Sequence, residues 1–261
     1  MIINHNMNAM NAHRNAGLNT AQAAKSMEKL SSGLRINRAA DDAAGLSISE
    51  KMRGQIKGLN QAQRNTQDGV SYLQTAEGAL TEVSDMLTRM KELTVQKSNC
   101  TYNTDDIDNL KLEMNQLGAQ IDKIIEETKF NGKTVFDSEI SIKVIDSDDV
   151  AKGLTIGIDG NTLDDAKDLN KDSKTADVEA AIKAVNTARS TFGAQQNRLE
   201  YTANNLGTTA ENLTAAESRI RDTDMALEMT KLSSKNIITQ ASQSMLAQAN
   251  QSQQNVLSLL R

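Results

Sequence analysis

An unbroken apolar heptad repeat through residues 178–220 constrains the possible folds of this chain more than any other feature. Seven-residue spacing of apolar side chains is typical of a helix seam. One helix of this length would span roughly 65 Å at about 1.5 Å per residue. Each large apolar side chain that leaves water contributes about 1.5 to 3 kcal/mol, so other helices must cover the seam. The repeat consists of Val178, Val185, Phe192, Leu199, Leu206, Leu213 and Ile220.

Three polar residues interrupt the second row of this seam, three positions after the apolar one. These positions weaken a coiled coil, and we expect a seam that gives up some cohesion in order to pack in a polymer. The residues are Gln195, Thr202 and Thr209.

The composition favours helices around a thin core. Proline and tryptophan are absent and aromatic residues make up 2% of the chain. Proline is normally about 5% of a sequence and is the commonest helix breaker. The predicted fold is therefore mainly α: an elongated antiparallel helical bundle or coiled-coil rod whose core is built from Leu, Ile, Val, Met and Ala.

Two further stretches supply partners for the long seam. Apolar residues recur at three- and four-residue steps over 73–94 and 107–128, and the polar stretch 97–104 lies between them. Asp105 and Asp106 suit the positive end of the second helix. Two such helices with a short connection form an antiparallel hairpin. Its expected seam residues are Leu73, Leu80, Leu87, Ile107, Leu110, Leu117 and Ile121.

Residues 129–176 differ in character and predict a small β-hairpin region. Turns are expected at Asn131–Gly132 and Asp159–Gly160, with short strands at 133–136, 141–145 and 154–158. The acidic residues here lack the spacing and closing Glu of a calcium loop, so a solvated acidic loop is the better interpretation.

The two chain ends are low-charge, weakly apolar helices. Residues 30–45 predict an irregular connector in which Asp41 or Asp42 caps a short helical stretch, and the apolar register slips near 221–225, which marks a bend or a change of partner. Such helices are marginal alone. We expect them to be disordered in the monomer and to fold together on self-association. The expected self-association core is Ile3, Met7, Met10, Leu18, Ile237, Met245, Val256, Leu257, Leu259 and Leu260.

Four segments follow from these patterns. We expect an N-terminal inner helix with its connector at 1–40, rod helices and the β region at 41–177, a C-terminal rod helix at 178–224, and a C-terminal inner helix at 225–261. No cleaved signal peptide or membrane-spanning helix is predicted, because the first residues lack both a basic start and a continuous apolar run.

The sequence offers little for catalysis or cofactors. The net charge of −5 comes without a basic cluster beside aromatic residues, which argues against nucleic-acid binding. His5 and His13 are too far apart to share one helical turn as metal ligands, and the lone Cys100 cannot close an intramolecular disulfide. Phosphate-binding glycine loops and the nucleophile elbow are absent. We expect no enzyme, no metal and no cofactor; an enzyme would need a site of scattered carboxylates and amides.

Several long motifs resemble the two ends of bacterial flagellin. They are LSSGLRINRAADDAAG at 30–45, GLNQAQRNTQDGVSYLQTAEGAL at 58–80, FGAQQNRLE at 192–200, SRIRDTD at 218–224 and QSMLAQANQSQQNVLSLLR at 243–261. The resemblance implies an extracellular filament subunit for motility, with coaxial terminal helices inside a rod layer. The chain departs from the family in its short middle and at Gln253, where relatives often have proline.

The resemblance also implies partners. These are copies of the chain itself, an export chaperone, the filament cap and the host Toll-like receptor 5. The segment LTRMKELTVQ at 87–96 is similar to the receptor-contact segment, which places contacts at Arg89 and Leu93, with Glu113 from the next helix. The alternative is that Arg89 and Glu113 are ordinary surface charges and Leu93 a rim residue. The apolar end at Val256, Leu257, Leu259 and Leu260 resembles the segment sensed by NAIP-family receptors.

Two other functions fit part of the pattern. A hook–filament junction protein resembles flagellin at its ends, although the length of the shared motifs favours flagellin. A soluble coiled-coil adaptor would explain the seams but not the low-charge ends. Neither nucleic-acid binding nor membrane insertion is expected.

Overall fold

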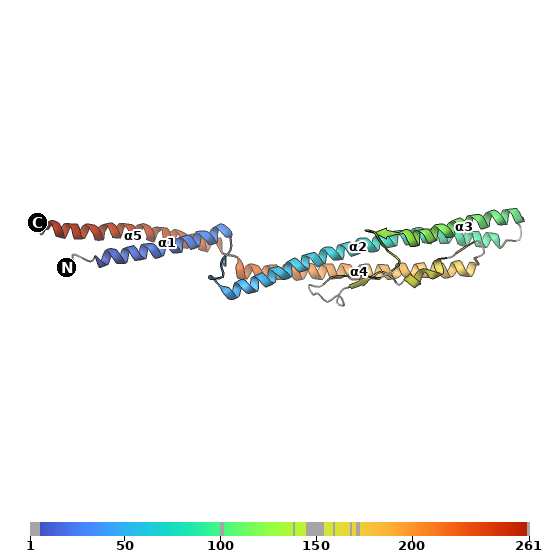
Figure 1. The fold of residues 1–261 in the computed structure, drawn as a ribbon, viewed down its shortest axis with the longest axis horizontal. Coiled ribbons are helices and arrows are strands. Elements are labelled where there is room, and N and C mark those ends of the chain that lie inside the picture. Colours follow the sequence, from blue (N-terminus) through green and yellow to red (C-terminus); the bar gives the residue numbers. More distant parts are fainter. Residues whose placement is uncertain are drawn as a thin grey trace. The chain divides into compact units, whose positions relative to one another are not determined.

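The computed structural model describes residues 6–99, 102–137, 139–144, 154–158, 160–167, 169–170 and 173–259. Five long helices confirm the predicted mainly α fold (Figure 1): α1 Met7–Ser32, α2 Ala43–Lys97, α3 Thr104–Glu127, α4 Thr175–Arg221 and α5 Met225–Leu259. The chain divides into two compact units. We call Met1–Gly54 with Leu213–Arg261 the terminal unit, and Gln55–Asn212 the central unit.

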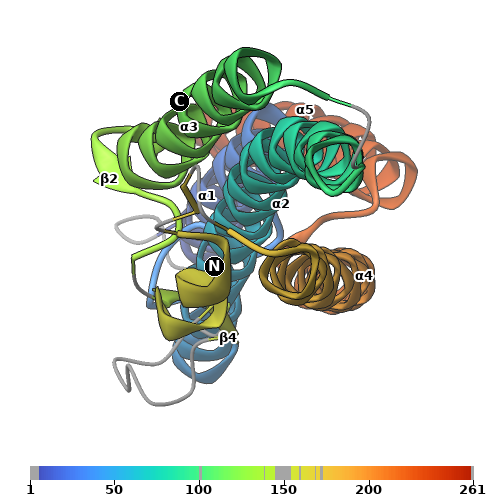
Figure 2. The ribbon, with the colours of Figure 1, turned by 90° about the vertical axis from the view of Figure 1, so that its right-hand side faces the viewer.

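The central unit is a helical bundle with one continuous apolar core. Within it, α2, α3 and α4 pack around a common axis (Figure 2). The structure buries the predicted seam residues Leu73, Leu80, Leu87, Ile121, Val185, Phe192, Leu199 and Leu206 in this core, and packs Leu110 and Leu117 against it. Ile107, Leu213 and Ile220 are half-buried. Met90, Leu93 and Met114 join the core as fully buried side chains.

Helix α2 is longer than the sequence predicted. We expected a short helix after Asp42 and a second helix from Leu73, but the structure has one helix of 55 residues. Gly54 and Gly58 made the first boundary uncertain. A helical glycine costs only about 1 kcal/mol relative to alanine. Since no proline interrupts the stretch and the buried seam begins at Ala62, the helix continues through both glycines.

Polar side chains mark the helix ends. Asn103 and Asp106 form a capping box at the start of α3, where Asp105 and Asp106 were expected. Asp42 accepts a 2.8 Å hydrogen bond from the Gly45 N–H and so begins α2. Asp224 accepts bonds from the first N–H groups of α5, so the predicted register slip is a break between two helices.

The predicted small β-hairpin region is confirmed, and it contains two antiparallel strand pairs. Strands β1 Lys129–Phe130 and β2 Lys133–Thr134 pair antiparallel across the Asn131–Gly132 turn. Strands β3 Ile140–Ile142 and β4 Leu154–Ile156 form a second antiparallel pair. Asn131 and Gly132 have positive φ angles of 50° and 81°, and asparagine and glycine are the residues that adopt such angles most readily in a tight hairpin turn. The prediction of a turn at Asp159–Gly160 was wrong at Gly160, which begins the 3-10 helix η2 Gly160–Ala166. Asp159, the acidic residues 146–149, Asp168 and Asp172 lie outside the described residues.

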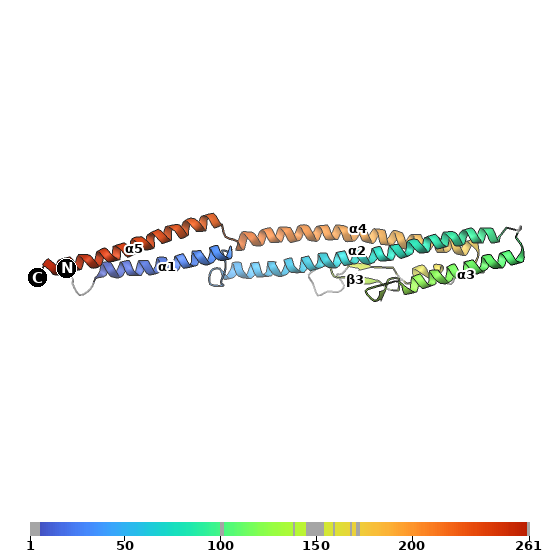
Figure 3. The same ribbon diagram turned by 90° about the horizontal axis from the view of Figure 1, so that it is seen from above.

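The hairpins lie along the helices of the central unit (Figure 3). The Tyr72 hydroxyl on α2 donates a 2.9 Å hydrogen bond to the Val135 carbonyl, and burial raises the pKa of Tyr72. Its ring meets Phe130 edge to face at 5.8 Å. Ile142 packs directly over Gly69, where a Cβ would overlap its side chain. The short strands are therefore fixed by helix contacts, because two- and three-residue strands are not stable alone.

Candidate functional site

Helices α1 and α5 form an antiparallel pair within the terminal unit (Figures 1 and 3). Two cross-helix hydrogen bonds lie at opposite ends of the pair. The Asn6 side-chain amide donates to the Ala249 carbonyl at 3.0 Å, and the Ser26 hydroxyl donates to the Glu228 carboxylate at 2.6 Å. The two bonds are twenty residues apart on the α1 side (Asn6 to Ser26) and twenty-one apart on the α5 side (Glu228 to Ala249). The two helices therefore lie side by side in a constant register between these bonds.

This pair leaves most of its apolar side chains in water. Among the described residues of the terminal unit, only Ala23 and Ile36 are buried hydrophobic residues. Eleven of the fifteen large apolar side chains exposed in the described chain belong to this unit. We call ten of them the terminal apolar residues: Met7, Met10, Leu18, Met27, Met225, Leu227, Met229, Ile237, Ile238 and Met245. Apolar surface of this extent marks an interaction site.

Five residues of the expected self-association core belong to this exposed set: Met7, Met10, Leu18, Ile237 and Met245. Ile3 and Leu260 lie outside the described residues, and Val256, Leu257 and Leu259 lie on α5 with side chains that are not described. The other five exposed residues were not part of the expected core: Met27, Met225, Leu227, Met229 and Ile238. Ile238 directly follows Ile237, and two adjacent apolar residues on a helix widen the apolar surface beyond one seam.

The connectors beside the helix pair are tied to each other. The Arg35 N–H donates to the Arg221 carbonyl at 2.6 Å, and the Thr223 N–H donates to the Gly33 carbonyl at 3.0 Å. The Arg35 guanidinium also binds the Ile220 carbonyl at the end of α4. Arg221 pairs with Glu50 at 2.6 Å. The sequence predicted only an irregular connector here, because residues so far apart in the chain give no local signal of pairing.

The expected receptor contacts lie on the central unit. Arg89 on α2 binds Glu113 on α3 at 3.1 Å and Glu92 at 3.0 Å, and all three side chains are exposed. The bonds to Glu92 and Glu113 raise the pKa of Arg89. Leu93 is different, since it is fully buried and belongs to the core. The structure therefore places Arg89 and Glu113 together on the surface and Leu93 beneath it, not at the rim.

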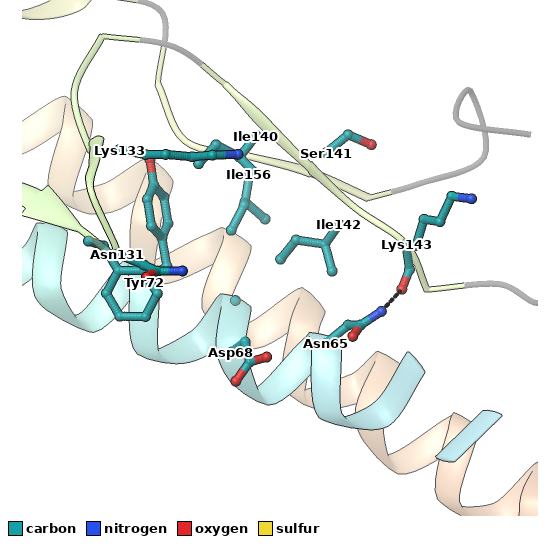
Figure 4. A pocket seen from close by; sticks show the side chains of 12 residues that line it. Asn65, Asp68, Tyr72, Asn131, Lys133, Ile140, Ser141, Ile142, Lys143 and Ile156 are labelled. Carbon is teal, nitrogen blue, oxygen red and sulfur yellow. Dashed lines mark hydrogen bonds between the residues drawn. The ribbon is translucent and has the colours of Figure 1, made fainter. Parts of the chain in front are cut away.

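A groove of about 410 Å³ lies between α2 and the two hairpins (Figure 4). Its floor is apolar, with Tyr72, Ile142 and Ile156, and the Asn65 amide crosses it to the Lys143 carbonyl at 3.2 Å. Neither His nor Cys lines it. Within the described part of the chain, no group of three or more His, Cys, Asp or Glu side chains could hold a metal ion. No helix there is both long and apolar enough to span a membrane.

Comparison with known proteins identifies the family of this chain. The model of the bacterial flagellin N-terminal helical region matches residues 3–140, and that of the C-terminal helical region matches residues 175–260. The chain belongs to the bacterial flagellin family. It is 52% identical to a flagellin of Halalkalibacterium halodurans and 46% identical to a flagellin of Bacillus subtilis, in each case over 100% of both chains.

Other relatives carry names that describe the filament directly. A flagellar filament 33 kDa core protein of Treponema phagedenis is 44% identical over the full length of both chains. A crystal structure of Bacillus cereus flagellin is 36% identical, covers 59% of this chain and 94% of that one, and superposes with a TM-score of 0.48. This flagellin is therefore a structural subunit of the bacterial flagellar filament.

Proposed function

We propose that this flagellin polymerises through the helix pair α1–α5. The observation that carries the proposal is the set of terminal apolar residues, which are exposed in one chain. Ten side chains of Met, Leu and Ile would be covered when copies pack around them. Burial contributes about 1.5 to 3 kcal/mol for a complete side chain, so even partial burial of ten is a large driving force.

The same proposal gives the four expected segments their places in a polymer. Segments 1–40 and 225–261 would form an inner layer, and segments 41–177 and 178–224 an outer one. Ordering of the ends on assembly supports growth at a filament tip, because a helix pair with so little buried apolar surface is stable only when further chains cover it.

Seeded growth tests this function. Monomer salted onto sheared filament fragments should lengthen them, as measured by electron microscopy. Ile237→Asp should stop elongation, because it places a charge among the terminal apolar residues. Leu112→Asp is the matched control, since Leu112 is 67% exposed on α3, outside the helix pair, and this variant should still elongate. A small discrete oligomer in place of fibres would favour a coiled-coil adaptor.

The second candidate is a hook–filament junction protein. The resemblance of its ends to flagellin motivates it, but full-length identity to flagellins favours a filament subunit. Elongation decides between them, because a junction protein would add only a short layer to a seed and then stop.

We further infer host and export partners from the family. The exposed Arg89–Glu113 pair supports contact with Toll-like receptor 5. Leu93 is buried beneath this pair and would support it by packing in the core. Arg89→Ala should weaken receptor signalling by cultured cells, whereas Arg64→Ala, elsewhere on α2, should not. NAIP-family receptors, an export chaperone and the filament cap are proposed partners of the terminal helices, and binding assays with the isolated partners test them.

A further inference from the structure

Glu228 is the only charged residue that is buried in the described part of the chain. Its side chain is 7% exposed and lies near the start of α5, facing α1. One carboxylate oxygen accepts the 2.6 Å hydrogen bond from Ser26, which is itself buried on α1. The other oxygen binds the Lys231 ammonium at 3.0 Å. A buried carboxylate needs such partners, since an unpaired buried charge is strongly unfavourable.

Between the connectors and the Asn6–Ala249 hydrogen bond, the Ser26–Glu228 contact is the one described side-chain hydrogen bond that joins α1 to α5. Ala, Gln, Ser and Asn make up most of both helices, and such repetitive surfaces pack nearly as well after a shift of one turn. A single buried polar pair in an apolar seam is the best-attested way to specify register. A one-turn shift would separate the Ser26 hydroxyl from Glu228 and so break this hydrogen bond.

Both helices present a positive charge to this carboxylate. Lys231 stands three residues after Glu228 on α5, and Lys29 stands three residues after Ser26 on α1. The Ser26 hydrogen bond, followed by Lys231 and Lys29, lowers the pKa of Glu228 below its ordinary value near 4.5. A carboxylate with a lowered folded-state pKa stabilises the fold above its unfolded-state pKa, and this contribution is lost as pH falls through the folded-state value.

We propose that the Ser26–Glu228 hydrogen bond is the register lock of the α1–α5 pair, and that it makes flagellin self-assembly sensitive to acid. Glu228 and Ser26 are positioning residues: they hold the terminal apolar residues of one chain in the arrangement that copies recognise. This inference rests on the proposed polymerisation through α1–α5. Loss of the lock displaces one helix along the other, so copies meet a mismatched surface.

The test uses the full chain in seeded filaments and measures the critical concentration from pH 7 down to pH 3, so that the series passes below the ordinary pKa near 4.5. Wild-type elongation at pH 7 tests polymerisation itself, separately from the lock. Glu228→Gln removes the charge with little change of shape, and we expect its critical concentration at pH 7 to rise about tenfold. The excess over wild type should shrink as the pH falls. Glu211→Gln is the matched control, because Glu211 is exposed on α4 in the central unit.

A reciprocal exchange provides the rescue. In S26E/E228S the carboxylate moves to α1, where Lys29 takes the place of Lys231, and the hydroxyl moves to α5. We expect this double variant to return to within about threefold of wild type and to regain the acid response. The inference is overturned if Glu228→Gln shifts the critical concentration equally at every pH, or if the exchange assembles no better than Glu228→Gln. Should Glu228→Gln form no filaments at all, recovery in the exchange variant decides alone.

Discussion

Gln195 shows how one polar residue in an apolar seam can have a specific structural purpose. Its side-chain amide accepts a 2.9 Å hydrogen bond from the Gly157 N–H and donates a 2.8 Å bond to the Gly157 carbonyl. Gly157 has a φ of 112°, which is open only to glycine without strain. The heptad pattern marked Gln195 as a weak point of the seam. In the structure it anchors the end of β4 to α4.

Replacing Gln195 should therefore destabilise the central unit. Gln195→Leu extends the apolar seam but leaves both polar groups of Gly157 without their partner, and we expect a loss of about 1 to 3 kcal/mol in the free energy of unfolding. Thr202→Leu is the control, because the Thr202 hydroxyl bonds only the Arg198 carbonyl one turn back on its own helix. Urea denaturation measures both. Equal stability of Gln195→Leu and wild type would contradict the anchoring role.

Gly118 is required by a close backbone approach. A Cβ at this position of α3 would overlap the carbonyl oxygen of Leu169, which crosses the helix there. Gly118→Ala should cost about 1 to 3 kcal/mol, since the backbone of the crossing segment must move. Gly78 on α2 faces open space, so Gly78→Ala should stabilise by up to about 1 kcal/mol. Thermal unfolding should show a lower melting temperature for Gly118→Ala and a higher one for Gly78→Ala. A higher melting temperature for Gly118→Ala as well would argue against the close contact between Gly118 and Leu169.

At the scale of elements, sequence periodicity predicted what depends on neighbours in the chain. Three- and four-residue spacing located the helices, and Asp106 and Asp42 marked two of their starts because capping is a local interaction. Strand β1 was not predicted, because its two residues show no strand pattern of their own. They pair with β2 only because the Asn131–Gly132 turn reverses the chain direction. The three- and four-residue steps over 73–94 end at Thr94 and pass over Leu93, whereas the structure buries both residues.

Removing residues 233–261 should separate the two roles of the chain. The apolar core runs only from Ala62 to Leu206, so the truncated protein keeps every buried contact of the central unit. We expect helical circular dichroism with a cooperative thermal transition, together with complete loss of seeded elongation. Global unfolding of the truncated protein would contradict this division of labour.

At the scale of the whole molecule, the apolar side chains are divided unequally between the two units. The central unit buries one continuous cluster that includes Phe136 and Phe192, whereas the terminal unit buries little beyond Ala23 and Ile36 and exposes Met and Ile side chains. Conformational entropy costs about 1 to 2 kcal/mol for each ordered residue, and only burial on a similar scale can offset it. One chain supplies that burial in the central unit, and assembly must supply it in the terminal unit.

This asymmetry predicts how protease susceptibility changes on assembly. In unassembled protein, trypsin should cut within α1 and α5 first, at sites such as Lys25, Lys29 and Lys235, and leave a resistant fragment that contains residues 55–212. In filaments the same sites should be protected, because neighbouring chains cover the helix pair and hold it ordered. Mass spectrometry of timed digests measures both states. Equal resistance of the terminal helices in monomer and filament would show that the α1–α5 pair is stable alone. That result would contradict the proposal that the terminal helices become ordered only on assembly.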